Sequence, residues 1–232
     1  MLSRRVSLFW YVAYAVIGVV FLGAVAFKVF QPVQVLPRVR LAPGFQMVDH
    51  RGAPLSSEAL RGQVVLFTFW YSHCPDPCFD ILPTMEYVAR HLDQVPEMQQ
   101  VAIPVAFVVV SLDPARDTPE VLQAYAREME ARTGKTWYFV THPDPEVLKT
   151  YVGAGFQVYY EPQPDGTIRF DPRYILVDGW GIIRGEYKYE TVVSTRDRIL
   201  RHFGVLAREI QNSRGAAKLA YEAAHLFLCY AP

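Results

Sequence analysis

The chain has 232 residues, a formal net charge of zero and a hydrophobic content of 51%. This length suits one globular domain with additional segments, and the balanced charge excludes the strongly basic surface typical of nucleic-acid binding. Three cysteines are too few for a disulfide-stabilised scaffold. Any thiol chemistry is therefore expected at one site of the chain rather than throughout the fold.

The N-terminal segment predicts a transmembrane anchor at residues 1–30. Residues 6–27 form a run of 22 residues without a charged side chain, and about 20 apolar residues cross the hydrocarbon core as a helix. A cleaved signal peptide is the alternative, although its apolar core usually has only about 7–15 residues. Arg4 and Arg5 precede the run and favour a cytoplasmic N-terminus. We therefore expect a single-pass protein of the cytoplasmic (inner) membrane, with its domain on the periplasmic or extracytoplasmic side.

A proline-containing linker and a globular domain are expected after the anchor. Residues 31–43 contain Pro32, Pro37 and Pro43, and such a segment behaves as a semi-stiff spacer. The domain is predicted at residues 44–212. Apolar runs and turn residues predict strands at 45–48, 64–70, 101–112, 137–140, 174–177 and 182–187. Helical spacing predicts helices at 79–92, from 119 to at least 129, at 145–152 and from Ser194. The fold class is therefore α/β, a mixed sheet flanked by helices on both faces.

The last segment, residues 213–232, is expected to be an apolar helical tail. Leu219, Ala223, Leu226 and Phe227 fall on one face of such a helix, and an exposed stripe of this kind usually contacts a partner or a membrane surface. Cys229 lies in the tail and is interpreted as a small apolar residue; a lipid-modified or disulfide-bonded cysteine is the alternative.

The most informative residues are Cys74 and Cys78, which directly follow the buried strand predicted at residues 64–70. A helix is predicted directly after them, so both sulfurs lie at a strand-to-helix junction where helix-terminal N–H groups lower thiol pKa values. Two thiols at this spacing have two uses. They close a disulfide, or they bind one soft metal ion from the same side.

Three stretches of sequence resemble the motifs of the Sco/SenC family. The first is residues 67–78, FTFWYSHCPDPC; the second is residues 110–119, VSLDPARDTP; the third is residues 155–161, GFQVYYE. They occur in the family's order and spacing, and the likeness extends over about residues 41–210. The resemblance implies a thioredoxin-like fold. It also implies that Cys74 and Cys78 are both the reactive thiols and copper ligands.

The resemblance further implies a role in assembling the copper-A centre of cytochrome c oxidase. Members either deliver copper or keep the target cysteines reduced, so the chain is expected to be a copper chaperone or a thiol–disulfide oxidoreductase. The expected cargo is Cu(I), which suits thiolate ligands. The expected partners are the membrane and cytochrome oxidase or another electron-transfer complex.

The chain departs from the family at the third copper ligand. That histidine falls eight residues before the end of the strand that finishes at Asp178, which is Phe170 here. A phenyl ring cannot coordinate a metal through a lone pair, so stable binding of both copper states is doubtful. Pro172 matches the position of the cis-proline of thioredoxins, which favours thiol exchange; an ordinary strand start is the alternative.

Three further residues have two interpretations each. His73 either influences Cys74 or is an exposed loop residue, and His142 either approaches the cysteines or begins a helix. Asp113 either approaches the cysteine loop or ends a strand. Arg173 is a candidate for activating a thiolate, which a peroxide-handling enzyme would require.

A second function, that of a structural protein rather than an assembly factor, is also consistent with the sequence. With a degraded copper site and an apolar tail, the chain would serve as an accessory or structural subunit of a membrane respiratory or photosynthetic electron-transfer complex. The motifs favour the assembly role.

Overall fold

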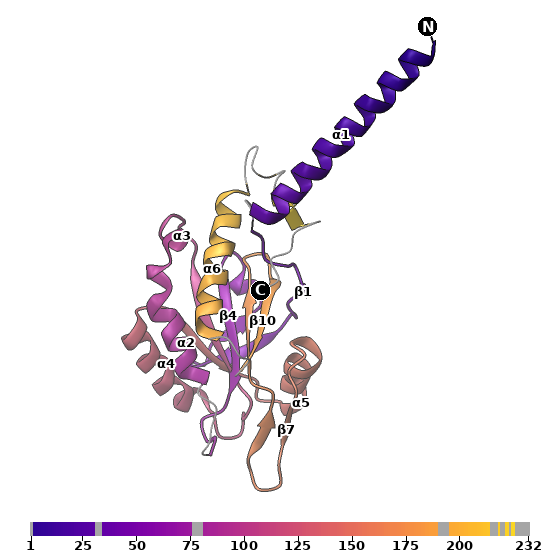
Figure 1. Cartoon of the computed structure of the whole chain (residues 1–232). Coiled ribbons are helices and arrows are strands. Elements are labelled where there is room, and N and C mark those ends of the chain that lie inside the picture. The colour runs from indigo at the N-terminus through magenta and orange to yellow at the C-terminus, as the bar shows by residue number, and fades with distance from the viewer. Residues whose placement is uncertain are drawn as a thin grey trace.

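The computed structural model describes residues 2–30, 34–75, 81–189, 195–213, 218, 221–222 and 224–225, and in the first helix the side chains of 9–23 and 25. The first helix, α1 (Leu2–Phe30), extends away from the rest of the chain (Figure 1). Its described apolar side chains are exposed, with Phe9 at 67% and Tyr11 at 73%. Among the described residues, no helix combines the length and apolar character needed to cross a membrane. The structure therefore adds no support to the anchor at 1–30, which remains a prediction.

A mixed sheet forms the centre of the domain. Within the described residues, eight strands are ordered β1 (Arg40–Leu41), β10 (Ile182–Lys188), β9 (Arg173–Val177), β4 (Val64–Trp70), β5 (Val105–Ser111), β6 (Thr136–Thr141), β2 (Gln46–Asp49) and β3 (Pro54–Ser56). The pairs β4–β5 and β5–β6 are parallel, and the other pairs are antiparallel. The predicted α/β class with a mixed sheet is confirmed.

The middle strands form because their side chains are apolar on both faces. All seven residues of β4 are buried, as are six of the seven in β5, which is the pattern of a parallel sheet covered on both sides. The predicted strand at 101–112 begins only at Val105. Pro104, directly before it, has no N–H to donate, although its carbonyl accepts the N–H of Val64 at 2.9 Å.

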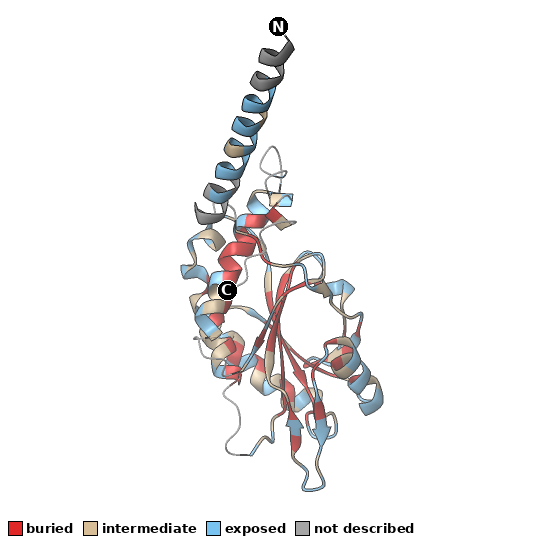
Figure 2. Cartoon of the chain, turned by 45° about the vertical axis from the view of Figure 1, so that its right-hand side comes forward, coloured by how far each residue is buried: buried red, intermediate tan, exposed pale blue. Residues whose placement is uncertain are grey.

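Helices cover both faces of this sheet (Figures 1 and 2). The helices α2 (Ile81–His91), α4 (Pro119–Thr133) and α6 (Thr195–Gln211) lie on one face, with α3 (Pro96–Gln99) beside α6. On the other face lie α5 (Pro145–Lys149), the π-helical turn η3 (Thr150–Gly155) and the hairpin β7 (Tyr160–Pro162) with β8 (Ile168–Phe170). Two short 3-10 turns, η1 (Glu58–Leu60) and η2 (Leu92–Gln94), complete the elements. The hairpin β7–β8 and strand β3 were not predicted from sequence.

The segments flanking the domain also make contacts with it. Val35 and Leu36 are fully buried, and Arg40–Leu41 pairs with β10, so residues 34–43 pack on the domain where the sequence alone suggests a spacer. In the predicted tail the described residues 218, 221–222 and 224–225 are helical. Ser194, Cys229 and the apolar residues Leu219, Ala223, Leu226 and Phe227 lie outside the described residues.

Candidate functional site

The predicted thiol site lies in the loop that follows β4. Cys74 comes four residues after Trp70, the last residue of β4, and packs partly buried against the core. It is disulfide-bonded, and its partner lies outside the described residues. Cys78 also lies outside them, so its predicted pairing with Cys74 as a catalytic or metal-binding centre remains a prediction. Within the described part of the chain, no three His, Cys, Asp or Glu side chains gather as a metal site.

The carboxylate of Asp117 holds the beginning of this loop. Asp117 is fully buried in the segment before α4. It accepts the backbone N–H of Ser72 at 3.1 Å, the hydroxyl of Ser72, and the hydroxyl of Ser111 at the end of β5. The parallel strands β4 and β5 end at the same edge of the sheet, which brings these three residues together. The loop therefore leaves β4 in a fixed direction two residues before Cys74.

His73 continues the same chain of contacts toward solvent. The hydroxyl of Ser72 lies 2.7 Å from Nδ1 of His73, and this nitrogen lies 3.9 Å from Asp117 Oδ1. The His73 side chain is 55% exposed. Buried carboxylate, hydroxyl and exposed imidazole thus form one connected series that ends beside Cys74.

The hairpin β7–β8 packs against Tyr71, the first residue after β4. Tyr71 is fully buried, and its hydroxyl accepts the N–H of Ile168 at 3.1 Å. The Tyr71 ring meets Phe170 edge to face, with centroids 6.0 Å apart. Position 170 therefore lies against the loop that carries Cys74, and the residue there is a buried aromatic ring rather than a metal donor.

Asp113 does not take the position that its motif suggested. Its carboxylate pairs with the guanidinium of Arg116, whose Nη2 donates to the carbonyl of Gly166 at 2.6 Å. These contacts tie the loop after β5 to the turn of the β7–β8 hairpin. Of the two acids in the second motif, Asp117 is therefore the one that contacts the cysteine loop. Sequence reasoning missed it, although the shared edge of two adjacent strands was a usable signal.

Arg173 faces carboxylates. Its guanidinium pairs with Asp171 and lies 3.8 Å from Glu186, and its backbone carbonyl accepts the hydroxyl of Thr68. A guanidinium neutralised in this way is poorly suited to stabilise a thiolate, so the structure offers no support for a peroxide-handling enzyme.

The histidines other than His73 have structural partners. Nδ1 of His142 accepts the backbone N–H of Asp144, the N-cap residue of α5, which confirms its role at a helix start. His91 contacts the carbonyl of Tyr87. His50 and His202 are buried, and His202 lies on α6. Burial lowers the pKa of His50, and it lowers that of His202 to about 4.

Aromatic packing supports the site from the helical side. Tyr125 on α4 lies edge to face against Trp70, with centroids 4.8 Å apart. Burial raises the pKa of the Tyr125 phenol, and the negative charge of Asp117 raises it further. This phenol therefore stays neutral at physiological pH and acts as a packing group.

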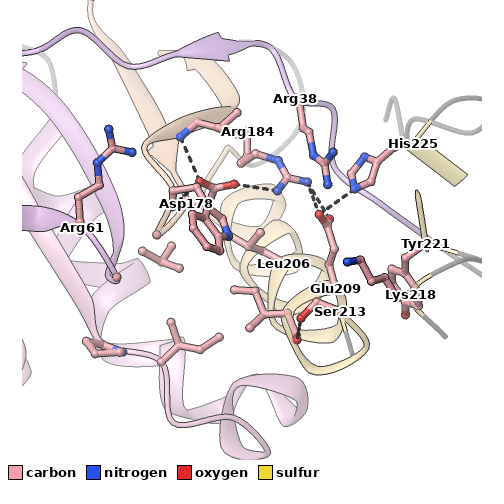
Figure 3. Close-up of a pocket in the computed structure, with 18 of the residues that line it drawn as sticks. Arg38, Arg61, Asp178, Arg184, Leu206, Glu209, Ser213, Lys218, Tyr221 and His225 are labelled. Carbon is pink, nitrogen blue, oxygen red and sulfur yellow. Dashed lines mark hydrogen bonds and ion pairs between the residues drawn. The ribbon is translucent and has the colours of Figure 1, made fainter. Parts of the chain in front are cut away.

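A separate cavity of about 1030 Å³ lies at the other end of the sheet (Figure 3). Its walls include Val64 at the start of β4 and Leu206 on α6. Here the buried Arg184 donates to Asp178 at 3.0 Å and to Glu209 at 2.7 Å, and Glu209 also contacts His225 at 2.9 Å. None of the predicted site residues lines this cavity. Arg184, Asp178, Glu209 and His225 are thus joined by direct contacts, as expected for a structural ion cluster.

Known proteins share the sequence and the fold of this domain. The SCO1/SenC family model matches residues 34–204. The chain is 32% identical over 124 residues to the mitochondrial SCO2 homologue of Mus musculus, covering 52% of this chain and 43% of that protein. It therefore spans less than half the length of that relative.

Two further matches cover more of the chain. A protein of Stutzerimonas stutzeri, named as a candidate copper-binding protein, is 28% identical over 168 residues, covering 72% of this chain and 79% of that one. The solved structure of Arabidopsis thaliana ScoI with copper bound has a TM-score of 0.56 and 21% identity, covering 70% of this chain and 97% of that one. This structural likeness shows the fold.

Proposed function

The chain belongs to the SCO1/SenC family, and from this premise we propose that it acts in assembling the copper centre of cytochrome c oxidase or a related respiratory complex. The observation that carries the proposal is a disulfide-bonded, partly buried Cys74 in a loop fixed to the end of the central strand. Once this disulfide is reduced, a thiol in this setting is both accessible and positioned, which reactive cysteines require.

One form of this role is reduction of a client disulfide by Cys74 and Cys78. The Cys74 thiolate attacks one client sulfur, a mixed disulfide forms, and the other client sulfur leaves as a thiolate. Cys78 then attacks Cys74, which releases the second client thiolate and leaves the Cys74–Cys78 disulfide. Two electrons pass from this protein to the client, and an external dithiol must restore the thiols.

The other form is carriage of copper as cargo between donor and client. Two thiolates suit Cu(I), a soft ion. The residue at the family's third ligand position, Phe170, supplies no donor atom, so the donor set of the family is incomplete at that position. The copper role therefore rests on Cys74, Cys78 and whichever nitrogen donor replaces the missing one.

We also place the protein at the cytoplasmic membrane, with the domain on its outer side. This part of the proposal is supported by the uncharged run at residues 6–27 and by Arg4 and Arg5 before it. Fusion of a reporter enzyme to the C-terminus tests it, because an enzyme active only outside the cytoplasm is expected to be active in this fusion and inactive in a fusion lacking residues 1–30.

The direct test uses the full-length chain in detergent after complete reduction. We expect about one Cu(I) per chain, and loss of this binding in Cys74→Ser and Cys78→Ser but not in Cys229→Ser. The reduced protein is also expected to reduce a model disulfide with formation of an intramolecular disulfide. If the chain neither binds Cu(I) nor exchanges with disulfides, the assembly role is wrong.

Phe170 favours a second candidate, a structural subunit of a membrane electron-transfer complex that has lost the family's copper chemistry. Purification in mild detergent from the native membrane separates the two. Co-purification with such a complex in a fixed molar ratio supports the subunit, whereas substoichiometric, transient association supports the assembly factor.

A further inference from the structure

The histidines of the chain are unequally placed with respect to Cys74. All six are described, and five of them contact the backbone or other side chains away from the cysteine loop: His50, His91, His142, His202 and His225. His73 alone is joined by a peptide bond to Cys74, and its side chain is 55% exposed. If imidazole contributes to chemistry at Cys74, His73 is the side chain in place to do so.

The hydrogen bonds of Ser72 determine which nitrogen of the His73 ring carries the proton. A carboxylate only accepts, so the single hydroxyl proton of Ser72 points to Asp117 Oδ1. The oxygen of Ser72 must then accept in its 2.7 Å contact with His73 Nδ1. It follows that Nδ1 carries a proton, and that Nε2 of the neutral ring holds the lone pair on the side of the ring away from Ser72.

The support behind this ring is rigid. Asp117 is fully buried, and its other oxygen is held by the Ser72 N–H and the Ser111 hydroxyl. Metal-binding histidines commonly donate their second ring N–H to a carboxylate, carbonyl or water, which fixes tautomer and orientation. Here the hydroxyl of Ser72 fills that place, and the buried carboxylate stands behind it.

We propose that Nε2 of His73 is a nitrogen ligand to copper bound at Cys74, with Ser72 and Asp117 as the groups that position it. The inference rests on the copper-handling form of the proposed function and deepens it. It supplies a nitrogen donor from the cysteine loop itself, where Phe170 offers none from the β7–β8 hairpin. Thiolate and imidazole together are a donor set that suits copper.

The first test counts donor atoms in the full-length reduced chain loaded with Cu(I) alone. X-ray absorption is expected to show sulfur and one imidazole nitrogen in the native chain, and sulfur only in His73→Ala. Cu(I) affinity is expected to fall about tenfold or more in His73→Ala and to be unchanged in the matched control His142→Ala. An unchanged nitrogen signal in His73→Ala overturns the inference.

A second measurement needs no copper and reports the positioning groups. In the metal-free protein labelled with ¹⁵N-histidine, we expect the His73 ring in the Nδ1-protonated form. Ser72→Ala removes the acceptor and is expected to shift the ring toward the other tautomer, and Asp117→Asn is expected to act in the same direction where the circular dichroism spectrum shows a folded chain. A native spectrum with Nε2 protonated overturns the assignment.

The copper measurements distinguish the role of His73 from copper binding by the chain as a whole. Copper bound through sulfur alone in both the native chain and His73→Ala refutes the role of His73 and leaves the proposed copper function standing. Absence of copper binding in the native chain refutes both.

Discussion

The two ends of the central sheet use buried carboxylates in opposite ways. At the end where β4 runs into the cysteine loop, Asp117 accepts only neutral donors from Ser72 and Ser111. At the other end, Asp178 and Glu209 pair with the buried cation Arg184. Because its partners are neutral, Asp117 orients the cysteine loop through hydrogen bonds. At the other end, the opposite charges of Arg184, Asp178 and Glu209 compensate one another and stabilise the fold. The cavity of about 1030 Å³ therefore lies at the end whose buried charges compensate one another, and not beside Cys74.

The strongest test of this contrast is Arg184→Met. The substitution leaves Asp178 and Glu209 buried without their cation, and breaking a buried ion pair costs about 3–5 kcal/mol. Urea unfolding of the full-length chain in detergent should show this loss. The matched control is Arg38→Met, because Arg38 forms an exposed pair with Glu222 at 3.2 Å, and such pairs contribute about 1 kcal/mol or less. Equal losses for both variants would contradict the role of the buried Arg184 as the cation that stabilises this end of the sheet.

Lowering the pH tests the stability of α6, the helix that carries Glu209 of this ion cluster and the buried His202. On α6, His202 shares a 2.7 Å hydrogen bond with Tyr187, and its pKa is lowered to about 4 chiefly by burial and then by Arg201 and Arg198. The unfolded chain binds this proton near the ordinary value of 6.5, so the neutral ring stabilises the fold above that pH.

Stability is therefore expected to fall as pH decreases from about 6.5 to about 4, by on the order of 3 kcal/mol at most, and not to change further from this group below that range. Urea unfolding at a series of pH values measures the effect. His202→Gln should flatten the profile in this window, and His91→Gln should not. A profile in His202→Gln that matches the native chain would assign the acid sensitivity to other groups.

The sequence predicted the middle strands of the sheet and the place of Cys74 directly after β4 because both are local patterns. Residues 64–70 form β4 as predicted, since an uninterrupted apolar run fits a strand buried on both faces. The helix predicted at 145–152 is α-helical only over Pro145–Lys149, and a π-helical turn at Thr150–Gly155 follows it. Helix ends depend on packing as well as on residue type, which explains this difference.

The role of Asp117 could not be predicted from its neighbours. Asp117, Thr118 and Pro119 form the pattern of a helix start, and α4 does begin at Pro119. The side chain of Asp117, however, is turned toward Ser72, which lies 45 positions earlier in the sequence. A local motif cannot indicate a partner at that separation. The same holds for Arg184 and Glu209, which lie on different elements and meet only in the folded chain.

Phe170→His tests whether an imidazole at position 170 supplies the nitrogen donor that Phe170 lacks. The substitution places an imidazole against the loop that carries Cys74, so we expect Cu(II) affinity to rise about tenfold, or about 1.4 kcal/mol. Loss of the edge-to-face contact with Tyr71 should lower stability by roughly 0.5–1.5 kcal/mol. Equilibrium titration with a chromophoric competitor measures affinity, and Phe170→Leu is the control for lost ring packing. A gain equal to that of Phe170→Leu would mean that position 170 does not reach the metal.

A last test separates the roles of the two carboxylate oxygens of Asp117. Ser111 donates to Oδ2, whereas the contact that leads to His73 passes through Oδ1. Ser111→Ala removes one donor and also the acceptor of the Asp113 N–H, so we expect a stability loss of about 1–2 kcal/mol. The Nδ1-protonated form of His73 should persist, because Ser72 keeps both of its contacts.

Ser72→Ala is the matched comparison, since it should change the His73 tautomer with a smaller loss of stability at this more exposed position. A tautomer change in Ser111→Ala as large as that in Ser72→Ala would show that the carboxylate orients the loop as a whole, and that its two oxygens do not have separate roles.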